Sequence, residues 1–105
     1  MIIPKYEVID KMENILNVAS DSTRIKILYS LLDEERTEKT VSEIVKDINA
    51  SQSLVSHQLK ILKDSRLVTS RRQGKNIFYS LIDRHVKLLL EVVYEHVTEE
   101  EEENE

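Results

Sequence analysis

The chain has 105 residues and contains no cysteine, one glycine and one proline. A chain of this length forms one small domain, and the lack of cysteine excludes disulfide scaffolds, iron–sulfur clusters and thiolate zinc fingers. No apolar run reaches the roughly 18 residues that a membrane-spanning helix needs. The N-terminus also lacks the pattern of a secretory signal, so we expect a cytoplasmic protein without a membrane partner.

The net charge of −5 hides an uneven distribution. Six of the twenty acidic residues lie within residues 99–105, which leaves +1 for residues 1–98. We expect residues 1–98 to form the domain and residues 99–105 to form an acidic tail. Between Ser51 and Ile77, six basic residues stand against the single acid Asp64, a local balance of +5. Such a basic region is typical of a surface that binds phosphate.

Apolar residues at helical spacing predict two helices in the first third of the chain. The first follows Pro4, and its apolar positions are Val8, Ile9, Met12, Ile15, Leu16 and Ala19. The second begins near Ser22, and the side chains that we expect to point inward are Ile25, Ile27, Leu28, Leu31 and Leu32. A polar loop over residues 33–39 separates the second helix from the next one.

A helix-turn-helix pattern follows the loop. Thr40 and Glu43 have the spacing of a capping box, which marks the start of a short helix whose inward residues are Val41, Ile44, Val45 and Ile48. A polar break over residues 49–51 comes next. Ser51 can then cap a further helix from Gln52 to about Asp64, with inward residues Val55, Leu59 and Leu62. Two short helices joined by a tight turn form a helix-turn-helix.

Two β-prone segments follow, over residues 67–72 and 77–81, and the turn between them contains Gly74. This pattern predicts a β-hairpin. A hairpin directly after the second helix of a helix-turn-helix is a wing. The predicted fold is therefore mainly α with a β-hairpin wing, that is, a winged helix-turn-helix domain.

Polar and basic side chains on the predicted recognition helix and wing are candidates for DNA contact. Those near the helix N-terminus can reach base edges in the major groove, and those on the wing can contact phosphate or the minor groove. The helix candidates are Gln52, Ser53, Ser56, His57, Lys60 and Lys63, and the wing candidates are Arg71, Arg72 and Lys75. For each helix candidate, a capping or merely solvated position is the alternative interpretation.

Four side chains that can bind metal lie at the two ends of the last predicted helix, as Asp83-x-His85 and His96-x-x-Glu99. The step from His85 to His96 is about 1100°, within about 20° of a whole number of turns, so both rings share one helix face. They also lie roughly 16 Å apart along the axis. Zinc holds imidazole nitrogen at about 2.0–2.1 Å, so the two rings cannot bind one ion.

An antiparallel copy of the same helix removes this mismatch. A two-fold axis between residues 90 and 91 brings His85 beside His96 of the partner subunit and Asp83 near Glu99 of the partner subunit. The prediction is a homodimer through terminal helices with two zinc sites, because four nitrogen and oxygen ligands complete a tetrahedron. Alternatively, Asp83 only caps the helix, or Glu95 or Glu100 takes the place of Glu99.

The helix-turn-helix over residues 51–63, the wing over residues 71–81 and the two ligand pairs resemble the ArsR/SmtB family of metal-sensing repressors. Within the family, the chain is similar to the zinc sensors whose ligands lie on the C-terminal helix. The resemblance implies a homodimeric repressor that leaves an inverted-repeat operator when zinc binds, which releases genes for metal efflux or sequestration. It also implies that His96 contacts a backbone carbonyl near Arg66, at the end of the recognition helix.

Other functions remain as alternatives. We do not expect an enzyme, because four converging ligands leave no coordination position for water and the sequence shows no nucleophile–base pair. A metal-independent winged-helix repressor or protein-interaction module predicts that zinc has no effect on DNA binding. A nickel or cobalt sensor predicts additional ligands around the same residues.

Overall fold

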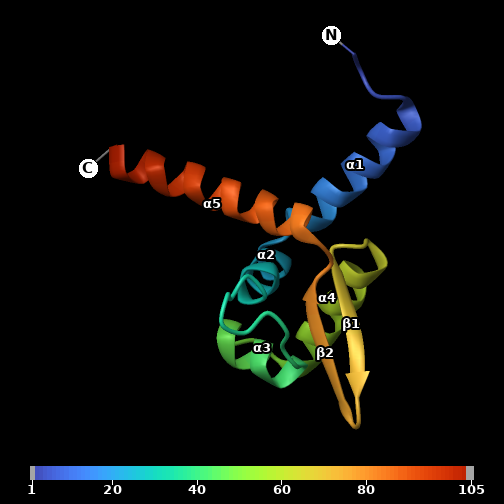
Figure 1. The fold of residues 1–105 in the computed structure, drawn as a ribbon, viewed down its shortest axis with the longest axis vertical. Helices are drawn as coiled ribbons and strands as arrows, with labels where there is room; N and C mark the ends of the chain where they lie inside the picture. The colour runs from blue at the N-terminus through green and yellow to red at the C-terminus, as the bar shows by residue number, and fades with distance from the viewer. Residues whose placement is uncertain (1, 104–105) are drawn as a thin grey trace.

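The computed structural model describes residues 2–103, with five helices and one two-stranded antiparallel sheet in that range. Figure 1 shows the elements in chain order. They are α1 (Tyr6–Ala19), α2 (Ser22–Ser30), α3 (Val41–Ile48), α4 (Gln52–Asp64), β1 (Val68–Gln73), β2 (Asn76–Leu81) and α5 (Arg84–Glu103). The predicted winged helix-turn-helix fold is confirmed, with every element in the expected place.

Short polar side chains start the helices of the helix-turn-helix. The Thr40 hydroxyl accepts a hydrogen bond from the Glu43 backbone N–H at 3.3 Å, and a Glu43 carboxylate oxygen accepts one from the Thr40 N–H at 3.1 Å. This is the predicted capping box. The Ser51 hydroxyl accepts a bond from the Leu54 N–H at 3.2 Å at the start of α4. Between the two helices, Asn49 takes a left-handed conformation with φ 53°, which ends α3.

The core lies between α2, α3, α4 and the base of the hairpin. Its buried apolar residues are Ile27, Leu28, Leu31, Ile44, Val55, Leu59, Leu62, Leu67, Val68 and Leu90. The prediction that Val55, Leu59 and Leu62 point inward is confirmed. Residues Val41, Val45 and Ile48 of α3 are partly buried against this core. The recognition half of the molecule, which consists of α2, α3, α4 and the hairpin, therefore supplies most of the core, and Leu90 of α5 completes it.

The prediction that Ile25 points inward is wrong, because 38% of this residue is exposed. At about 100° per residue, the middle of the helix face that carries Ile27, Leu28 and Leu31 lies about 110° from Ile25. In the first turn of α2, Arg24 lies on the same side of the helix as these buried residues, and its guanidinium group makes hydrogen bonds to Val18 and Gln58.

The wing is a regular hairpin that pairs Val68 with Leu81 at its base and Gln73 with Asn76 at its tip. Each strand is one residue longer at the tip than the sequence predicted. Gly74, with φ 62°, takes the first position of the two-residue turn, a conformation that glycine adopts without strain. The loop before α3 adds a further pair, Lys39 with Tyr79, beside β2.

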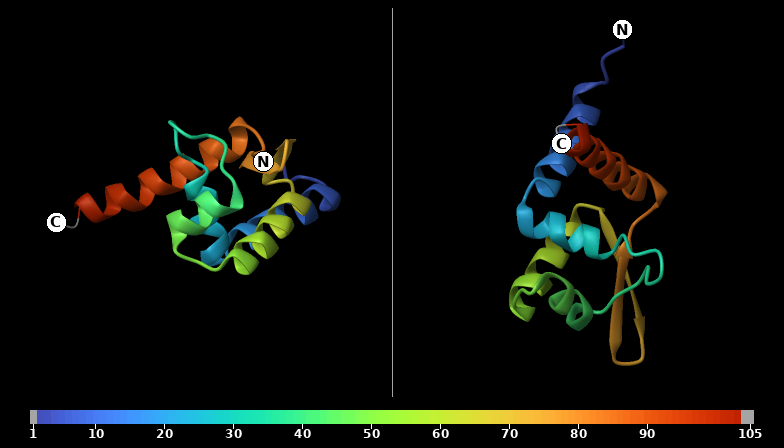
Figure 2. Two further views of the ribbon diagram at one scale, coloured as in Figure 1. Left: turned by 90° about the horizontal axis from the view of Figure 1, so that it is seen from below. Right: turned by 90° about the vertical axis from the view of Figure 1, so that its left-hand side faces the viewer.

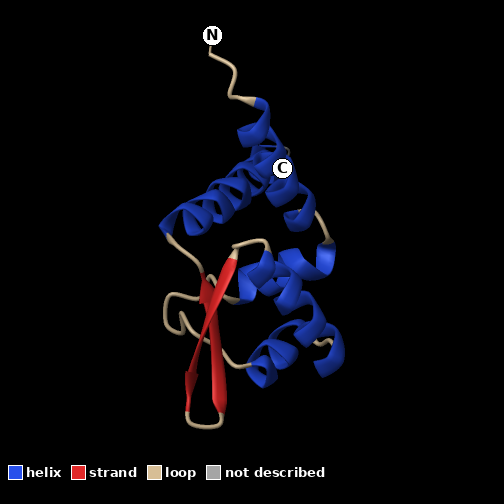
Figure 3. Ribbon diagram, turned by 90° about the vertical axis from the view of Figure 1, so that its right-hand side faces the viewer, coloured by secondary structure: helices blue, strands red, loops and turns tan. Residues whose placement is uncertain are grey.

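The terminal helices stand away from the core. Figures 1 and 2 show α1 and α5 diverging from the end of the molecule opposite the wing tip, and Figure 3 shows both helices above the hairpin. No residue of α1 is buried, and Leu90 is the buried residue of α5 among those with described side chains. Apolar residues exposed on the two helices include Val8, Met12, Leu16, Leu88, Leu89, Val92, Val93, Tyr94 and Val97.

Helix α5 continues into the acidic run and ends at Glu103. The helix therefore runs across the predicted boundary between residues 98 and 99, and the last two residues of the predicted tail lie outside the described residues. None of the helices within residues 2–103 combines the length and the apolar character needed to cross a membrane.

Candidate functional site

The exposed side of α4 carries the predicted DNA-contacting residues of the recognition helix. All of them are exposed: Gln52, Ser53, Ser56, His57, Lys60 and Lys63. Ser53 lies 3.4 Å from the capping hydroxyl of Ser51, so it belongs to the first turn of the helix. The structure places these side chains on one accessible surface, as DNA contact requires, while their individual roles stay predictions.

Hydrogen bonds of two side chains, Arg24 and Lys63, connect α4 to neighbouring elements. The Arg24 Nε donates to the Val18 carbonyl at 2.8 Å, and another guanidinium nitrogen donates to Gln58 Oε1 at 3.1 Å. At the other end of the helix, Lys63 Nζ donates to Ser70 Oγ of β1 at 2.7 Å. Lys63 therefore links the recognition helix to the wing. These contacts could not be predicted from local sequence patterns, because each joins residues that only the tertiary fold brings together.

The three basic candidates on the wing are exposed, but their surroundings differ. Arg71 makes a two-pronged pair with Glu38, with nitrogen–oxygen distances of 2.6 and 2.9 Å. The hydrogen bonds between the two side chains are the main reason why the pKa of Glu38 is lowered and the pKa of Arg71 is raised. Arg72 and Lys75 lie nearer the tip of the hairpin. The three cations are therefore not equivalent toward a phosphate group.

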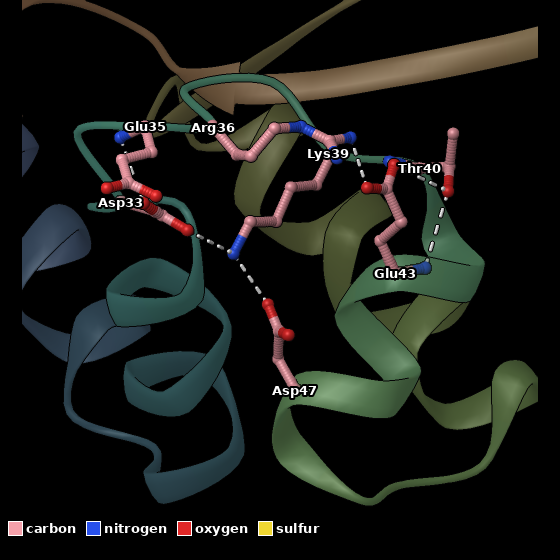
Figure 4. Close-up of polar contacts among 7 residues, drawn as sticks. All are labelled: Asp33, Glu35, Arg36, Lys39, Thr40, Glu43 and Asp47. Carbon is pink, nitrogen blue, oxygen red and sulfur yellow. Dashed lines mark hydrogen bonds and ion pairs between the residues drawn. The ribbon is translucent and has the colours of Figure 1, made fainter.

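A buried cation lies behind the wing, in the loop between α2 and α3. Lys39 is only 7% exposed, and its Nζ lies 3.4 Å from Asp33 and 2.6 Å from Asp47 (Figure 4). Its backbone exchanges hydrogen bonds of 2.9 and 2.8 Å with Tyr79 of β2. Figure 4 also shows the ion pair of Arg36 with Glu43 close to Lys39. These contacts hold the loop against both α3 and the wing.

Asp83 and His85 lie together at the start of α5. One Asp83 oxygen accepts a hydrogen bond from the Val86 backbone N–H at 3.1 Å, which caps the helix and is the main cause of the lowered pKa of Asp83. The other oxygen lies 3.6 Å from His85 Nδ1. The His85 side chain is 91% exposed. Asp83 thus has the capping role that the sequence left open, and it also holds a second oxygen beside the imidazole.

His96 and Glu99 are exposed on the distal part of α5, away from the first pair. Among the side chains that the structure describes, which end at Glu99, no three histidine, aspartate or glutamate side chains converge on a point where a metal ion fits. Within one subunit, the four predicted ligands therefore lie in two separate places, at the start and in the distal part of α5.

A groove of about 820 Å³ runs beside the first pair. Its walls come from α1, from the end of α4 and from the start of α5, and they include Asp10, Arg66, Asp83 and His85. Arg66 follows the last turn of α4 with φ 62°, a left-handed conformation that is rare for arginine. The groove places His85 next to the end of the recognition helix.

The family described as "Bacterial regulatory protein, arsR family" matches residues 21–70. The chain is also 38% identical, over 85 residues, to the cadmium resistance transcriptional regulatory protein CadC homolog of Staphylococcus aureus. That match covers 81% of this chain and 69% of the relative. The chain belongs to the ArsR family.

A second ArsR-family relative is the transcriptional repressor SmtB homolog of Synechocystis sp., 37% identical over 89 residues, or 85% of this chain and 65% of the relative. The match to these two curated relatives thus spans about two thirds of their length. Among solved structures, HlyU from Vibrio cholerae has a TM-score of 0.77 at 28% identity, covering 87% of this chain and 96% of that one. These relatives are transcriptional regulators, which agrees with the prediction that this chain is not an enzyme.

Proposed function

We propose that this ArsR-family protein is a cytoplasmic, homodimeric transcriptional repressor that leaves its operator when zinc binds between the subunits. Its release would allow expression of genes for metal efflux or sequestration. The observation that carries the proposal is the Asp83–His85 pair, held on the surface at the start of a helix with an exposed apolar face. The complementary pair, His96 and Glu99, lies farther along that helix.

The exposed terminal helices support a dimer. The chain exposes 8086 Å², whereas a folded monomer of 12.3 kDa typically exposes about 6,100 Å². Exposed apolar residues of α1 and α5 contribute to this area, and on α5 they include Leu88, Leu89 and Val92, which are 41–60% exposed. Antiparallel pairing of α5 with the same helix of a second subunit would cover these residues, because a two-fold interface uses one patch twice.

The spacing of Asp83 and His85 is compatible with zinc. Two ligands of a tetrahedral zinc ion with bonds of about 2.0–2.1 Å are about 3.3 Å apart, and the Asp83 oxygen lies 3.6 Å from His85 Nδ1. Because the other Asp83 oxygen caps α5, the carboxylate would bind the ion through one oxygen. The remaining ligands would be His96 and Glu99 of the partner subunit. Bound zinc would supply four bonds that join carboxylate and imidazole groups of two chains.

The positions of these residues indicate how metal binding would reach the DNA. Side chains from both subunits would hold the two α5 helices at one angle, and this angle sets the distance between the two α4 helices. Successive major grooves lie about 34–36 Å apart, so a dimer reads an inverted repeat only at one separation of its recognition helices. His85 shares a groove with Arg66 at the end of α4, which gives the ligand pair a short route to the recognition helix.

A ligand changes DNA affinity only if it binds two conformations with different affinity. The coupling free energy between two sites is typically about 1–3 kcal/mol, or about 5- to 150-fold in affinity. We therefore expect zinc to lower the affinity for the operator by about 5- to 150-fold or more.

The test is a zinc titration of the dimer on DNA at fixed salt, with a duplex that the metal-free protein has selected from a random-sequence pool. Zinc should release wild-type protein from this duplex. His96→Gln should bind the duplex normally but resist release by zinc. His57→Gln is the matched control, since it removes an exposed histidine from α4; it should bind zinc normally whatever its effect on DNA affinity.

Normal release of His96→Gln by zinc would contradict the proposed ligand set. If zinc, nickel and cobalt all leave the wild-type complex intact, the protein is a metal-independent repressor. If nickel or cobalt releases the protein at a lower free concentration than zinc does, the same fold serves a different metal.

A further inference from the structure

Arg71 of the wing is already bound to a carboxylate inside the molecule. Its Nε donates to one Glu38 oxygen at 2.6 Å, and a terminal nitrogen donates to the other at 2.9 Å. A further terminal nitrogen donates to Gln73 Oε1 at 2.9 Å, and the guanidinium carbon lies 4.9 Å from the centre of the Phe78 ring. Two parallel N–H···O bonds are the same geometry in which arginine binds a phosphate group.

Glu38 is held in this position by its neighbour. Lys39 is fixed by two backbone hydrogen bonds to Tyr79 and by ion pairs with Asp33 and Asp47. Because the loop cannot move away from the hairpin without breaking these contacts, the Glu38 carboxylate stays beside β2. Little side-chain freedom is then lost when it pairs with Arg71, which makes this pair stronger than an ordinary pair on a mobile surface.

We propose that Glu38 takes the place of a DNA phosphate on Arg71 and competes with DNA for this wing arginine. The inference rests on the proposed DNA binding. In the free protein, Arg71 contributes no net positive charge to the wing, because the carboxylate lies directly against it. Arg72 and Lys75 then provide the attraction for the backbone, and Arg71 reaches phosphate only by exchanging Glu38 for it. Glu38 thereby lowers the affinity of the wing for any duplex.

The experiment uses the full-length protein and a fluorescent, mixed-sequence duplex of about 30 base pairs, long enough for two half-sites one helical turn apart. A phosphate contact does not depend on base sequence, so no operator is needed. Glu38→Gln should bind about two- to fivefold more tightly per subunit than wild type, the range expected for loss of one exposed ion pair. The plot of log affinity against log salt concentration should become steeper by about one per subunit, because one more phosphate is neutralised.

Glu35→Gln is the matched control, since it removes the same charge from the same loop, and the described contacts of Arg71 do not include Glu35. It should change affinity much less than Glu38→Gln does. A second comparison uses Arg71→Gln, in which the competitor has no target. Adding Glu38→Gln to Arg71→Gln should give no gain beyond that of the Glu35 control.

Two results would overturn the inference while leaving the proposed function intact. One is equal affinity of Glu38→Gln and Glu35→Gln, and the other is weaker binding by Glu38→Gln, which would mean that Glu38 orients Arg71 toward DNA. If wild type and all variants fail to bind any duplex at low salt, the proposed function fails together with the inference.

Discussion

The recognition half of the molecule buries its apolar residues, whereas the two terminal helices leave most of theirs exposed. Helices α2, α3 and α4 place Ile27, Ile44 and Leu59 in the core, where each of these residues is 0% exposed. Helices α1 and α5 carry apolar stripes of the same kind, yet Leu16 and Val92 are 57% and 60% exposed. The recognition half is complete within one chain, whereas the terminal helices have the composition of a buried surface without its partner.

The polar groups of the two regions differ in the same way. In the recognition half, Lys39, Arg24 and Arg71 are each bound by groups of the same chain. On α5, the imidazoles of His85 and His96 face outward in two separate places. One chain can therefore shape the proposed DNA-binding surface, whereas each proposed metal site needs residues of two chains.

The largest expected difference between the two regions is in core packing. Leu59 is fully buried, so Leu59→Ala should lower the free energy of unfolding by about 2–5 kcal/mol through lost burial and the cavity left behind. Leu89→Ala, at a residue 42% exposed, should cost far less in dilute solution, where any dimer has dissociated. Urea unfolding at several protein concentrations measures both. Equal losses at the lowest concentration would contradict the division into two regions.

A charge on the apolar face of α5 should break the dimer and spare the fold. Val92→Glu would place a carboxylate in the proposed interface, where an unpaired charge is costly, so the dimer dissociation constant should rise at least about 100-fold. Sedimentation measures this change, and circular dichroism should show unchanged helix content.

Ser42→Glu is the control for this variant, since it adds the same charge at an exposed position of α3. If Val92→Glu and Ser42→Glu associate equally well, the dimer does not form through α5.

A hydrogen bond joins α5 to the recognition half, and its loss should have a moderate effect. The Tyr29 hydroxyl of α2 donates to the Leu90 carbonyl of α5 at 2.7 Å, and the Tyr29 ring lies 6.3 Å from that of Tyr94. Tyr29→Phe keeps the ring and should lower the free energy of unfolding by about 0.5–1.5 kcal/mol. Tyr94→Phe removes a hydroxyl from a residue that is 59% exposed, so thermal unfolding should show a smaller change. Equal shifts would mean that the Tyr29 bond does not anchor α5.

The smallest expected effect is the dependence of stability on pH. The pKa values of Asp33, Glu38 and Glu43 are lowered, chiefly by hydrogen bonds from the Glu35 backbone, the Arg71 side chain and the Thr40 backbone, respectively. A group whose pKa is lower in the folded protein stabilises it above the ordinary pKa, here 3.8 or 4.5, and this contribution is lost as pH falls further.

Urea unfolding between about pH 6 and pH 3 should therefore show a gradual loss of stability towards acid. Glu43→Gln should be less stable than wild type at pH 6 and should lose less on acidification. A variant that runs parallel to wild type over the whole range would contradict the assignment.

Local signals made most of the fold predictable. Thr40 with Glu43, Ser51 before α4, and Gly74 in the hairpin each act on backbone within four residues, so their positions were evident in the sequence. Ile25 was placed wrongly because apolar spacing alone does not say which side of a short helix the tertiary contacts cover.

Only the part of the candidate site that depends on neighbouring residues could be predicted from the sequence. Asp83 and His85 are neighbours in sequence, and the structure brings them together. The contacts of Arg71 with Glu38 and of Lys39 with Asp47 depend on how the loop before α3 packs beside β2, which no local pattern reports. Pairing of His85 with His96 depends on a second chain, so it stays a prediction.

The most direct test of this account mixes two defective subunits. His85→Ala and His96→Ala homodimers should each bind no zinc tightly, since both of their sites lack one imidazole. A heterodimer of the two variants, purified through different tags, has one site without either histidine and one site with both. Zinc analysis should therefore give two ions per wild-type dimer, none for either variant and one for the heterodimer. A heterodimer without zinc, or a single variant that still binds two ions, would contradict a metal site shared between the α5 helices.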